Sequence, residues 1–432
     1  MVKVFLMIVS FILSSGLLAD SPRPGRILVK VKEGKRIPKF NLMKSGKKLF
    51  KNYYVLYSND IVSLAKKLKQ HPSVEQLKVD SKRKKISKLP QAKNITKDLG
   101  GRENSEILND PGVKRQWHLK GREDNGMDIL KAYEELGRKQ GKEIIVAVVD
   151  TGVDYNHEDL KSIMWVNENE IPNNGIDDDN NGYIDDVHGI DTLDRNAKGK
   201  ATGDPMDTHN HGTHVSGIIA AAQNNGIGVA GVASNVKIMA IRTVPNFGDE
   251  TDIDVAESFL YAAKMGARVI NCSFGKAKNE GGMLVRDTIN HIGQKYGVLV
   301  VASAGNESSN IDTKFKYPAS FDSPNLLTVA SSTSRGRLSG FSNYGKKNVD
   351  LTAPGSGIYS TVRRNRYASM SGTSMSGPAA AGVVAETLSR NPKLNPIALK
   401  KLIMKSVEVS EVYKGKMVAP GLSNLKNSLE NL

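Results

Sequence analysis

The C-terminal three quarters of this chain contain short, nearly uninterrupted runs of β-branched and small apolar residues, separated by stretches with helical periodicity. The clearest runs and helical stretches are residues 144–149, 213–223, 237–241, 253–265, 269–271 and 298–302. Strands without a polar face are typical of a parallel sheet that is covered on both sides. We therefore predict an α/β fold over residues 109–432, with a mainly parallel central sheet flanked by helices. The active site should lie in loops at the carboxyl ends of its strands.

The first residues of the chain have a different pattern. Residues 1–19 contain one lysine, Lys3, followed by an apolar run from Val4 to Leu18. This run is shorter than the roughly 20 residues that a helix needs to span a bilayer. It predicts a signal peptide, and hence a secreted protein, extracellular or periplasmic, without a stable membrane anchor after cleavage. An uncleaved membrane anchor is the alternative.

Residues 20–80 predict a small α+β domain of the ferredoxin-like class, with the order β–β–α–β. Strand patterns occupy residues 27–31, 53–57 and 74–79, and Asp60 can cap a helix before the last of them. Residues 81–108 are rich in Lys, Asn and Gly and have little apolar pattern. They predict an exposed linker that is open to proteolysis.

The formal net charge of +16 suggests a nucleic-acid partner at first sight. Nearly all of this charge lies in residues 20–108, however, whereas acidic and basic side chains balance in residues 109–432. Because an enzyme of nucleic acids needs its basic surface beside its chemistry, we expect no nucleic-acid partner. The single cysteine, Cys272, excludes an internal disulfide, so packing or bound ions must stabilise an exported chain. We interpret Cys272 as a small buried side chain on a strand.

Three motifs place a reactive side chain among small residues at a strand-to-helix junction. They are VAVVDTGVD around Asp150, HNHGTHVSGIIAAA around His211, and SGTSMSGPAAAGVVAETL around Ser374. Each is weak alone: the carboxylate could bind a metal, His209 and His214 are rival histidines, and a serine at a helix start is usually a cap. Their conjunction points to nucleophilic catalysis, in which an imidazole takes the hydroxyl proton and a carboxylate orients the imidazole.

The segments VVDTGVD, HGTHVSG and GTSMSGP resemble the three signature motifs of the subtilase (subtilisin-like serine protease) family. NNGIGVAGVA, VINCSFG, ASAGN, YPAS and LTAPG also resemble family segments, in family order, so the likeness covers most of residues 109–432. It implies a subtilisin-like three-layer fold and a serine endopeptidase in which Asp150 orients the base, His211 is that base and Ser374 is the nucleophile. It also implies that Asn306 in ASAGN and the Ser374 N–H form the oxyanion hole.

The resemblance further implies a cleft in which a polypeptide substrate adds a strand to an exposed sheet edge. The residues that it assigns to this cleft are Ser273, Phe274, Gly275, Ala302, Ser303, Ala304, Gly305 and Lys316. Lys316 predicts a preference for acidic or small side chains just before the scissile bond. The alternative is that Lys316 points to solvent or pairs with Glu307.

Two calcium sites are expected, the first from the resemblance to the family's tight site. The residues of this first site are Asp159, Gln223, Asn225, Ile227 and Val229. The second follows the alternating oxygen pattern of an EF-hand loop, with the ligands Asp177, Asp179, Asn181 and Asp185. Its twelfth position is His188 rather than Glu, so another carboxylate such as Asp186 would complete the shell. A solvated acidic loop is the alternative.

By the same resemblance, residues 20–80 are a propeptide that assists folding and inhibits the cleft of a zymogen. The chain would then cut itself within residues 81–108 and act as a monomer on polypeptide substrates through an acyl-enzyme. The alternative is a non-catalytic surface protein on the same scaffold that binds polyanions or proteins. Such a protein should lack one of the reactive side chains or Asn306, and this chain has them all.

Overall fold

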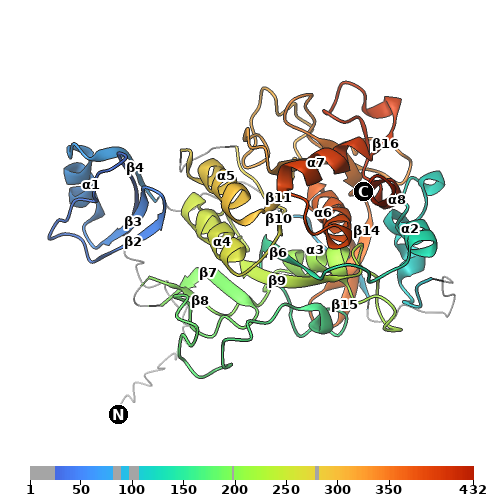
Figure 1. Ribbon diagram of the computed structural model, residues 1–432, viewed down its shortest axis with the longest axis horizontal. Helices are drawn as coiled ribbons and strands as arrows, with labels where there is room; N and C mark the ends of the chain where they lie inside the picture. The colour runs from blue at the N-terminus through green and yellow to red at the C-terminus, as the bar shows by residue number, and fades with distance from the viewer. Residues whose placement is uncertain (1–24, 81–88, 97–106, 197–198, 278–281) are drawn as a thin grey trace, which may run out of the picture.

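The computed structural model describes residues 25–80, 89–96, 107–196, 199–277 and 282–432. The signal peptide expected at residues 1–19 lies outside these ranges. Figure 1 shows a small unit, drawn in blue, beside a larger body that holds the other elements. Within the described ranges, no helix is long and apolar enough to cross a membrane.

The small unit is an antiparallel sheet in the order β2, β3, β1, β4 with one helix against it. Its elements are β1 Gly25–Val31, β2 Ser45–Phe50, β3 Tyr53–Ser58, α1 Ile61–Lys69 and β4 Val74–Val79. Asp60 caps α1 as predicted, since its carboxylate accepts a hydrogen bond of 3.0 Å from the Ser63 N–H. The sequence does not predict β2, because its exposed Ser45, Gly46 and Lys48 leave too few apolar positions for a strand pattern.

The body contains a ten-stranded sheet, and its pairs are parallel apart from the outer pairs β7 with β8 and β16 with β17. Its order is β16, β17, β13, β12, β11, β10, β6, β9, β7, β8. The bounds are β6 Ile144–Asp150, β7 Gly189–Arg195, β8 Ala201–Thr202, β9 Val236–Arg242, β10 Val269–Cys272, β11 Leu299–Ser303, β12 Leu326–Ser332, β13 Leu351–Pro354, β16 Glu408–Val409 and β17 Gly421–Leu422. The mainly parallel sheet predicted for this region is confirmed.

Helices cover both faces of this sheet (Figure 1). The helices of the body are α2 Ile129–Leu136, α3 His211–Ala220, α4 Asp252–Lys264, α5 Leu284–Tyr296, α6 Thr373–Arg390, α7 Pro396–Lys405 and α8 Leu425–Glu430. Alternate residues of β6 belong to different cores: Val146 and Val148 pack with the side of α3 and α6, and Ala147 and Val149 with the side of α4 and α5. This double burial is why the strands have no polar face. Cys272 is fully buried at the end of β10, as interpreted from the sequence.

A third, smaller sheet lies in the order β14, β15, β5. Its strands are β5 Lys93–Thr96, β14 Ile358–Val362 and β15 Arg366–Met370. The sequence analysis expects an exposed linker over residues 81–108 and does not predict the strand at residues 93–96. The reason is physical, because β5 is held by backbone pairing and its side chains are largely exposed, so no apolar pattern marks it. Residues 81–88 and 97–106 lie outside the described ranges.

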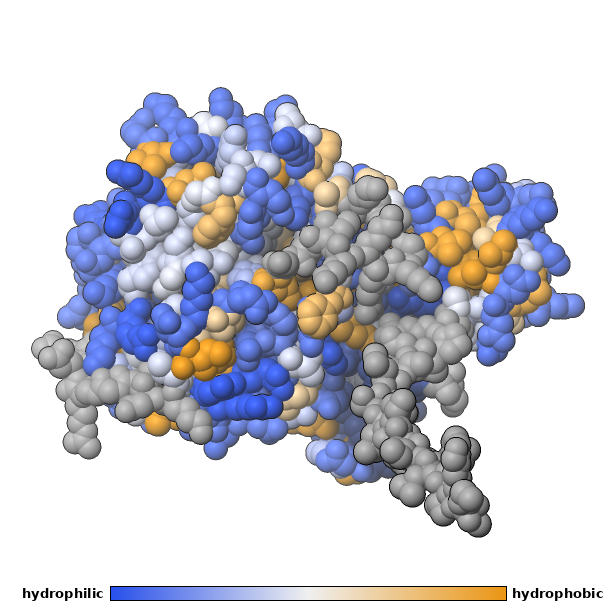
Figure 2. All heavy atoms as spheres, turned by 180° about the vertical axis from the view of Figure 1, so that it is seen from behind, coloured by the Kyte–Doolittle hydropathy of each residue, from blue (hydrophilic) through white to orange (hydrophobic). Residues whose placement is uncertain are grey.

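The small unit packs on α4 and α5. It does so through the face of its own sheet that lies opposite α1. Figure 2 shows it from behind as a lobe that protrudes from the body. Leu28 joins the core that contains Phe259 of α4. The Arg26 guanidinium lies 2.7 Å from Asp254, and the Tyr53 hydroxyl donates a hydrogen bond of 2.8 Å to Asp287. Apolar contact and buried charge pairs thus hold the two parts together.

Replacing Arg26 should weaken this interface, because it leaves Asp254 buried with fewer cationic partners. We expect Arg26→Ala to lower the free energy of unfolding of the uncleaved chain by about 3 kcal/mol. Lys30→Ala is the control, since the Lys30–Glu75 pair is partly exposed and should contribute less than about 1 kcal/mol. Urea unfolding of both variants measures the difference, and equal losses would contradict the interpretation.

Candidate active site

Asp150 and His211 form a buried pair at the carboxyl end of the central sheet. Asp150 is the last residue of β6, and His211 is the first residue of α3. His211 Nδ1 lies 2.7 Å from Asp150 Oδ1, which also accepts a hydrogen bond of 2.7 Å from the Thr151 N–H. A Cβ on Gly212 would lie 2.0 Å from the Gly152 carbonyl oxygen, so glycine is needed for this close approach. With Nδ1 engaged by the carboxylate, Nε2 is the nitrogen that can accept a proton.

The two rival histidines have different surroundings. His214 is fully buried, its Nε2 lies 3.0 Å from the Ala368 carbonyl oxygen, and burial lowers its pKa to about 3. His209 contacts the linker residue Gln91 through Nε2 at 3.4 Å, and burial together with His211 lowers its pKa. Of the three histidines, His211 is thus the one that hydrogen-bonds to Asp150.

Ser374 lies in the first turn of α6, where backbone N–H groups have no acceptor within the helix. Its hydroxyl donates a hydrogen bond of 3.0 Å to the Ser273 carbonyl oxygen, just after β10. Ser273 Oγ donates in return to the Ser374 carbonyl oxygen at 3.1 Å. His211 Nε2 has no hydrogen-bond partner among the residues that the structure describes. Transfer of the hydroxyl proton to His211 would therefore begin with release of the bond to Ser273.

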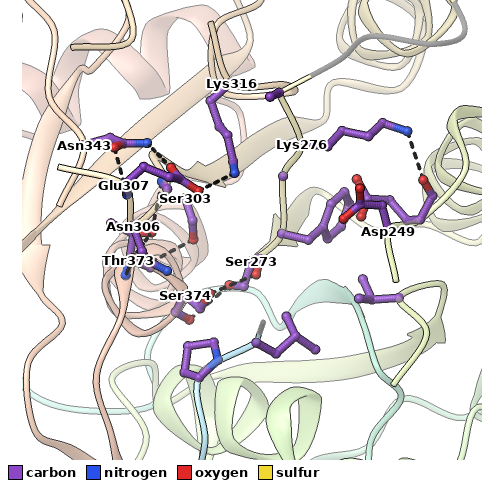
Figure 3. Close-up of a pocket in the computed structure, with 18 of the residues that line it drawn as sticks. Asp249, Ser273, Lys276, Ser303, Asn306, Glu307, Lys316, Asn343, Thr373 and Ser374 are labelled. Carbon is purple, nitrogen blue, oxygen red and sulfur yellow. Dashed lines mark hydrogen bonds and ion pairs between the residues drawn. The ribbon is translucent and has the colours of Figure 1, made fainter. Parts of the chain in front are cut away.

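Asn306 is fixed by the residue before Ser374. Its Oδ1 accepts hydrogen bonds from the Thr373 N–H at 2.8 Å and from the Thr373 hydroxyl at 2.9 Å. Figure 3 shows Asn306, Thr373 and Ser374 together along one wall of a pocket. Because Oδ1 is engaged, the Asn306 side chain presents its Nδ2 donor at the same end of the cleft as the α6 N-terminus. The sequence gives no signal for the part played by Thr373.

A cavity of about 630 Å³ opens beside these groups. Most of the residues that were predicted for the cleft line this cavity: Ser273, Phe274, Gly275, Ser303, Gly305 and Lys316. Asn306 and Ser374 line it as well. Ala302 and Ala304 are fully buried and do not line it, so that part of the prediction is wrong. Ala302, on β11, packs in the core on the side of α4 and α5, and Ala304, just after β11, packs in a smaller cluster with Ile311 and Val349.

Lys316 forms an ion pair with Glu307 rather than pointing freely into the cavity (Figure 3). The two charged groups lie 2.5 Å apart, and Glu307 also contacts Asn343 at 2.6 Å. Burial would raise the pKa of the Glu307 carboxyl, but the contact with Lys316 holds it below its ordinary value. The pairing that the sequence left as an alternative is therefore the one present.

The linker enters the cavity, which the sequence does not predict. Leu89 and Pro90 line it together with Ser374 and Asn306. A Cβ on Gly372 would lie 2.8 Å from Pro90 Cγ, which places the linker directly against the segment that leads into α6. No local signal marks these residues, because their position depends on contacts with elements far along the chain.

The first predicted calcium site combines the buried carboxylate of Asp159 with a loop that is exposed at residues 224–227. Burial raises the pKa of Asp159 to about 7, and the nearby Asp110, which the sequence analysis missed, adds to this effect. Asp159 accepts hydrogen bonds from Asn225 Nδ2 at 2.7 Å and from the Val229 N–H at 2.8 Å. The side chain of Gln223 is engaged elsewhere, since its Oε1 accepts from Arg138. The two carboxylates suit a hard cation, which would relieve their repulsion.

The second predicted site contains three carboxylates whose oxygens lie within 4.8 Å of one another, from Glu170, Asp177 and Asp179. Glu170 was not predicted, because it precedes the loop pattern. Asp185 instead accepts hydrogen bonds from the Asn174 and Gly175 N–H groups at 3.0 and 3.1 Å. Two further groups lie beside the cluster: Asn181 Nδ2 contacts Asp179 at 2.9 Å, and burial raises the pKa of Asp186 to about 6. The clustered carboxylates supply oxygen ligands of the kind that calcium prefers, whereas Asn181 turns its amide nitrogen toward Asp179.

Comparisons with known proteins agree on one family. A model of the subtilase family matches residues 141–426. Subtilisin-like protease 1 of Plasmodium berghei is 32% identical over 346 residues, which are 75% of this chain and 55% of the relative. The thermophilic serine proteinase of Bacillus sp. strain AK1 is 39% identical over 277 residues, 64% of this chain and 59% of the relative. The chain thus spans little more than half the length of these relatives.

Solved structures give the same result. Fervidolysin from Fervidobacterium pennivorans, a keratinolytic enzyme related to subtilisin, matches with a TM-score of 0.67 and 25% identity over 94% of this chain and 61% of that protein. A cold-adapted subtilisin-like serine proteinase matches with a TM-score of 0.51 and 30% identity over 66% of this chain and 89% of that protein. The family match includes β6, α3 and α6, which carry the residues described above. The chain therefore belongs to the subtilase family and has its subtilisin-like α/β fold.

Proposed function

We propose that this protein is a serine endopeptidase that hydrolyses peptide bonds of polypeptides with Asp150, His211 and Ser374. The observation that carries the proposal is the buried Asp150–His211 pair, at the same end of the sheet as a serine at a helix N-terminus. His211 Nε2 takes the proton of the Ser374 hydroxyl while Ser374 Oγ attacks the carbonyl carbon. His211 then returns that proton to the leaving amine, and an acyl-enzyme remains until water hydrolyses it. Asp150 orients the ring and stabilises its charged form.

Attack places a negative charge on the carbonyl oxygen, and two donors are positioned to bind it. Asn306 Nδ2 is one, because Thr373 engages the other end of the amide. The Ser374 N–H is the other, at the positive end of the α6 dipole. Such preorganised donors act without reorganisation at the moment of reaction, which is why they lower the barrier.

The small unit and the linker fit the part of an inhibitory propeptide in an exported zymogen. The small unit is fixed to α4 and α5, and Leu89 and Pro90 lie in the cavity with Ser374. A substrate cannot occupy the same space. Cleavage by the same active site within residues 81–108 would then release the enzyme, and a Ser374→Ala chain should stay uncleaved.

Asn306→Ala should lower kcat by about 100- to 1,000-fold with little change in KM, a magnitude measured on subtilisin, a member of the same family. The loss falls on kcat because the oxyanion exists only after attack. Ser374→Ala should abolish turnover, and Gln294→Ala, on the exposed side of α5, should not change it. Steady-state hydrolysis of a chromogenic peptide measures all three. A loss confined to KM in Asn306→Ala would assign that residue to substrate binding instead.

Glu307→Gln should expose the charge of Lys316 to the substrate. We expect the ratio of kcat/KM for peptides with Glu and with Gln before the scissile bond to rise about fivefold, as for a partly exposed ion pair. The variant Asp322→Asn, which removes an exposed carboxylate elsewhere, is the control. An unchanged ratio in Glu307→Gln would mean that Lys316 does not reach the side chain before the cut.

Calcium should stabilise the protein through the two carboxylate sites. At a free concentration one hundred times Kd, one site adds about 2.7 kcal/mol to the free energy of unfolding. Glu170→Gln should remove the contribution of the second site, because it takes one of the three clustered carboxylates. Thermal unfolding with calcium and with a chelator measures this gain, and Asp322→Asn should keep it in full. A gain in Glu170→Gln as large as in the unchanged protein would exclude that cluster as a ligand set.

A further inference from the structure

The linker crosses the candidate active site in a defined direction. Leu89 and Pro90 line the cavity with Ser374, and Pro90 lies against Gly372. Gln91 then reaches His209, the histidine beside His211. The chain therefore passes the reactive groups near Pro90 and continues toward the histidines, on the side where the leaving amine must receive its proton.

Beyond this point the linker becomes β5 and adds to β15 as an antiparallel strand. Lys93 is paired with Ser369 and Thr96 with Tyr367, with an irregularity between the two pairs. The Thr96 hydroxyl also lies 2.8 Å from the Tyr359 hydroxyl of β14. β15 ends at Met370, shortly before Ser374, so β5 runs away from the site along the strand that leads into it.

This pairing does not depend on the side chains of the linker to any large extent. Lys93, Asn94 and Ile95 are exposed, and Thr96 is half-buried. β15 lies between β14 and β5, so its outer edge presents backbone N–H and C=O groups that only β5 covers among the described residues. An uncovered strand edge of this kind accepts another extended chain with many different sequences.

We propose that, once β5 has left with the rest of the linker, the outer edge of β15 binds the part of a polypeptide substrate that follows the scissile bond. This inference rests on the proposed endopeptidase function. If the linker marks the path of a substrate, with the cut on one side or the other of Pro90, Lys93 corresponds to the third or fourth residue after the bond and Thr96 to the sixth or seventh. The edge then selects long, extended polypeptide segments over short peptides.

The test uses three peptides and the processed enzyme. All share the sequence up to the scissile bond; the short one ends two residues after it, and the long one ends eight residues after it. The long peptide should have a kcat/KM about tenfold higher, because two or three added backbone hydrogen bonds of ordinary net strength give that factor. A third peptide equals the long one but carries N-methyl groups on the third to seventh amides, and it should lose the gain.

A variant adds an independent measurement. Tyr359→Phe should reduce the gain of a long peptide with Thr at the sixth or seventh position and leave the short peptide unchanged, since only the hydroxyl contact is removed. Equal rates for short and long peptides, both abolished by Ser374→Ala, would overturn the strand site but not the proposed function. A gain that survives N-methylation would also overturn it. If neither the peptides nor a denatured protein is cut, the proposed function itself fails.

Discussion

The rest of the structure depends on the burial of a parallel sheet on both faces. Each strand that returns in the same direction needs a crossover, so helices cover the sheet and the carboxyl ends of the strands meet at one edge. Asp150 ends β6, Ser273 follows β10 and Ser303 ends β11 at this edge. The starts of α3 and α6 bring His211 and Ser374 to the same place. The position of the site therefore follows from the common direction of the parallel strands and not from any one loop.

Ion pairs between basic side chains of the small unit and acidic side chains of the body form part of the contact between them. Burial alone would raise the pKa of Glu257, but Arg195 and Lys47 hold it at about 2. Arg26 approaches Asp254 in the same cluster. Because Glu257 stays ionised down to strongly acidic pH, this interface remains charged in ordinary conditions. Arg26 and Lys47 of the basic first quarter thus form ion pairs with acidic side chains of the body.

Sequence could predict the elements whose side chains carry a pattern. The doubly buried strands, the cap at Asp60 and the helix start at His211 follow from local residues, and the family motifs point to Asp150, His211, Ser374 and Asn306. It could not predict β5, because that strand exists through backbone pairing with a partner far along the chain. Glu170 and Asp110 were not predicted for the same reason, since each lies beside its acidic neighbours only in the folded chain. The features that were predicted and those that were missed differ in how far along the chain their partners lie, and not in residue type.

The strand pairing on β15 also bears on how inhibition would end. The linker is anchored on both sides of the cavity, by β5 on one side and by the small unit on α4 and α5 on the other. A segment held at two points has a high effective concentration at the site between them. Cutting one bond beside Pro90 would leave each piece with its own anchor, so cleavage alone does not empty the cleft. Release of the enzyme then depends on loss of both anchors, and the weaker one, with four strand residues, should leave first.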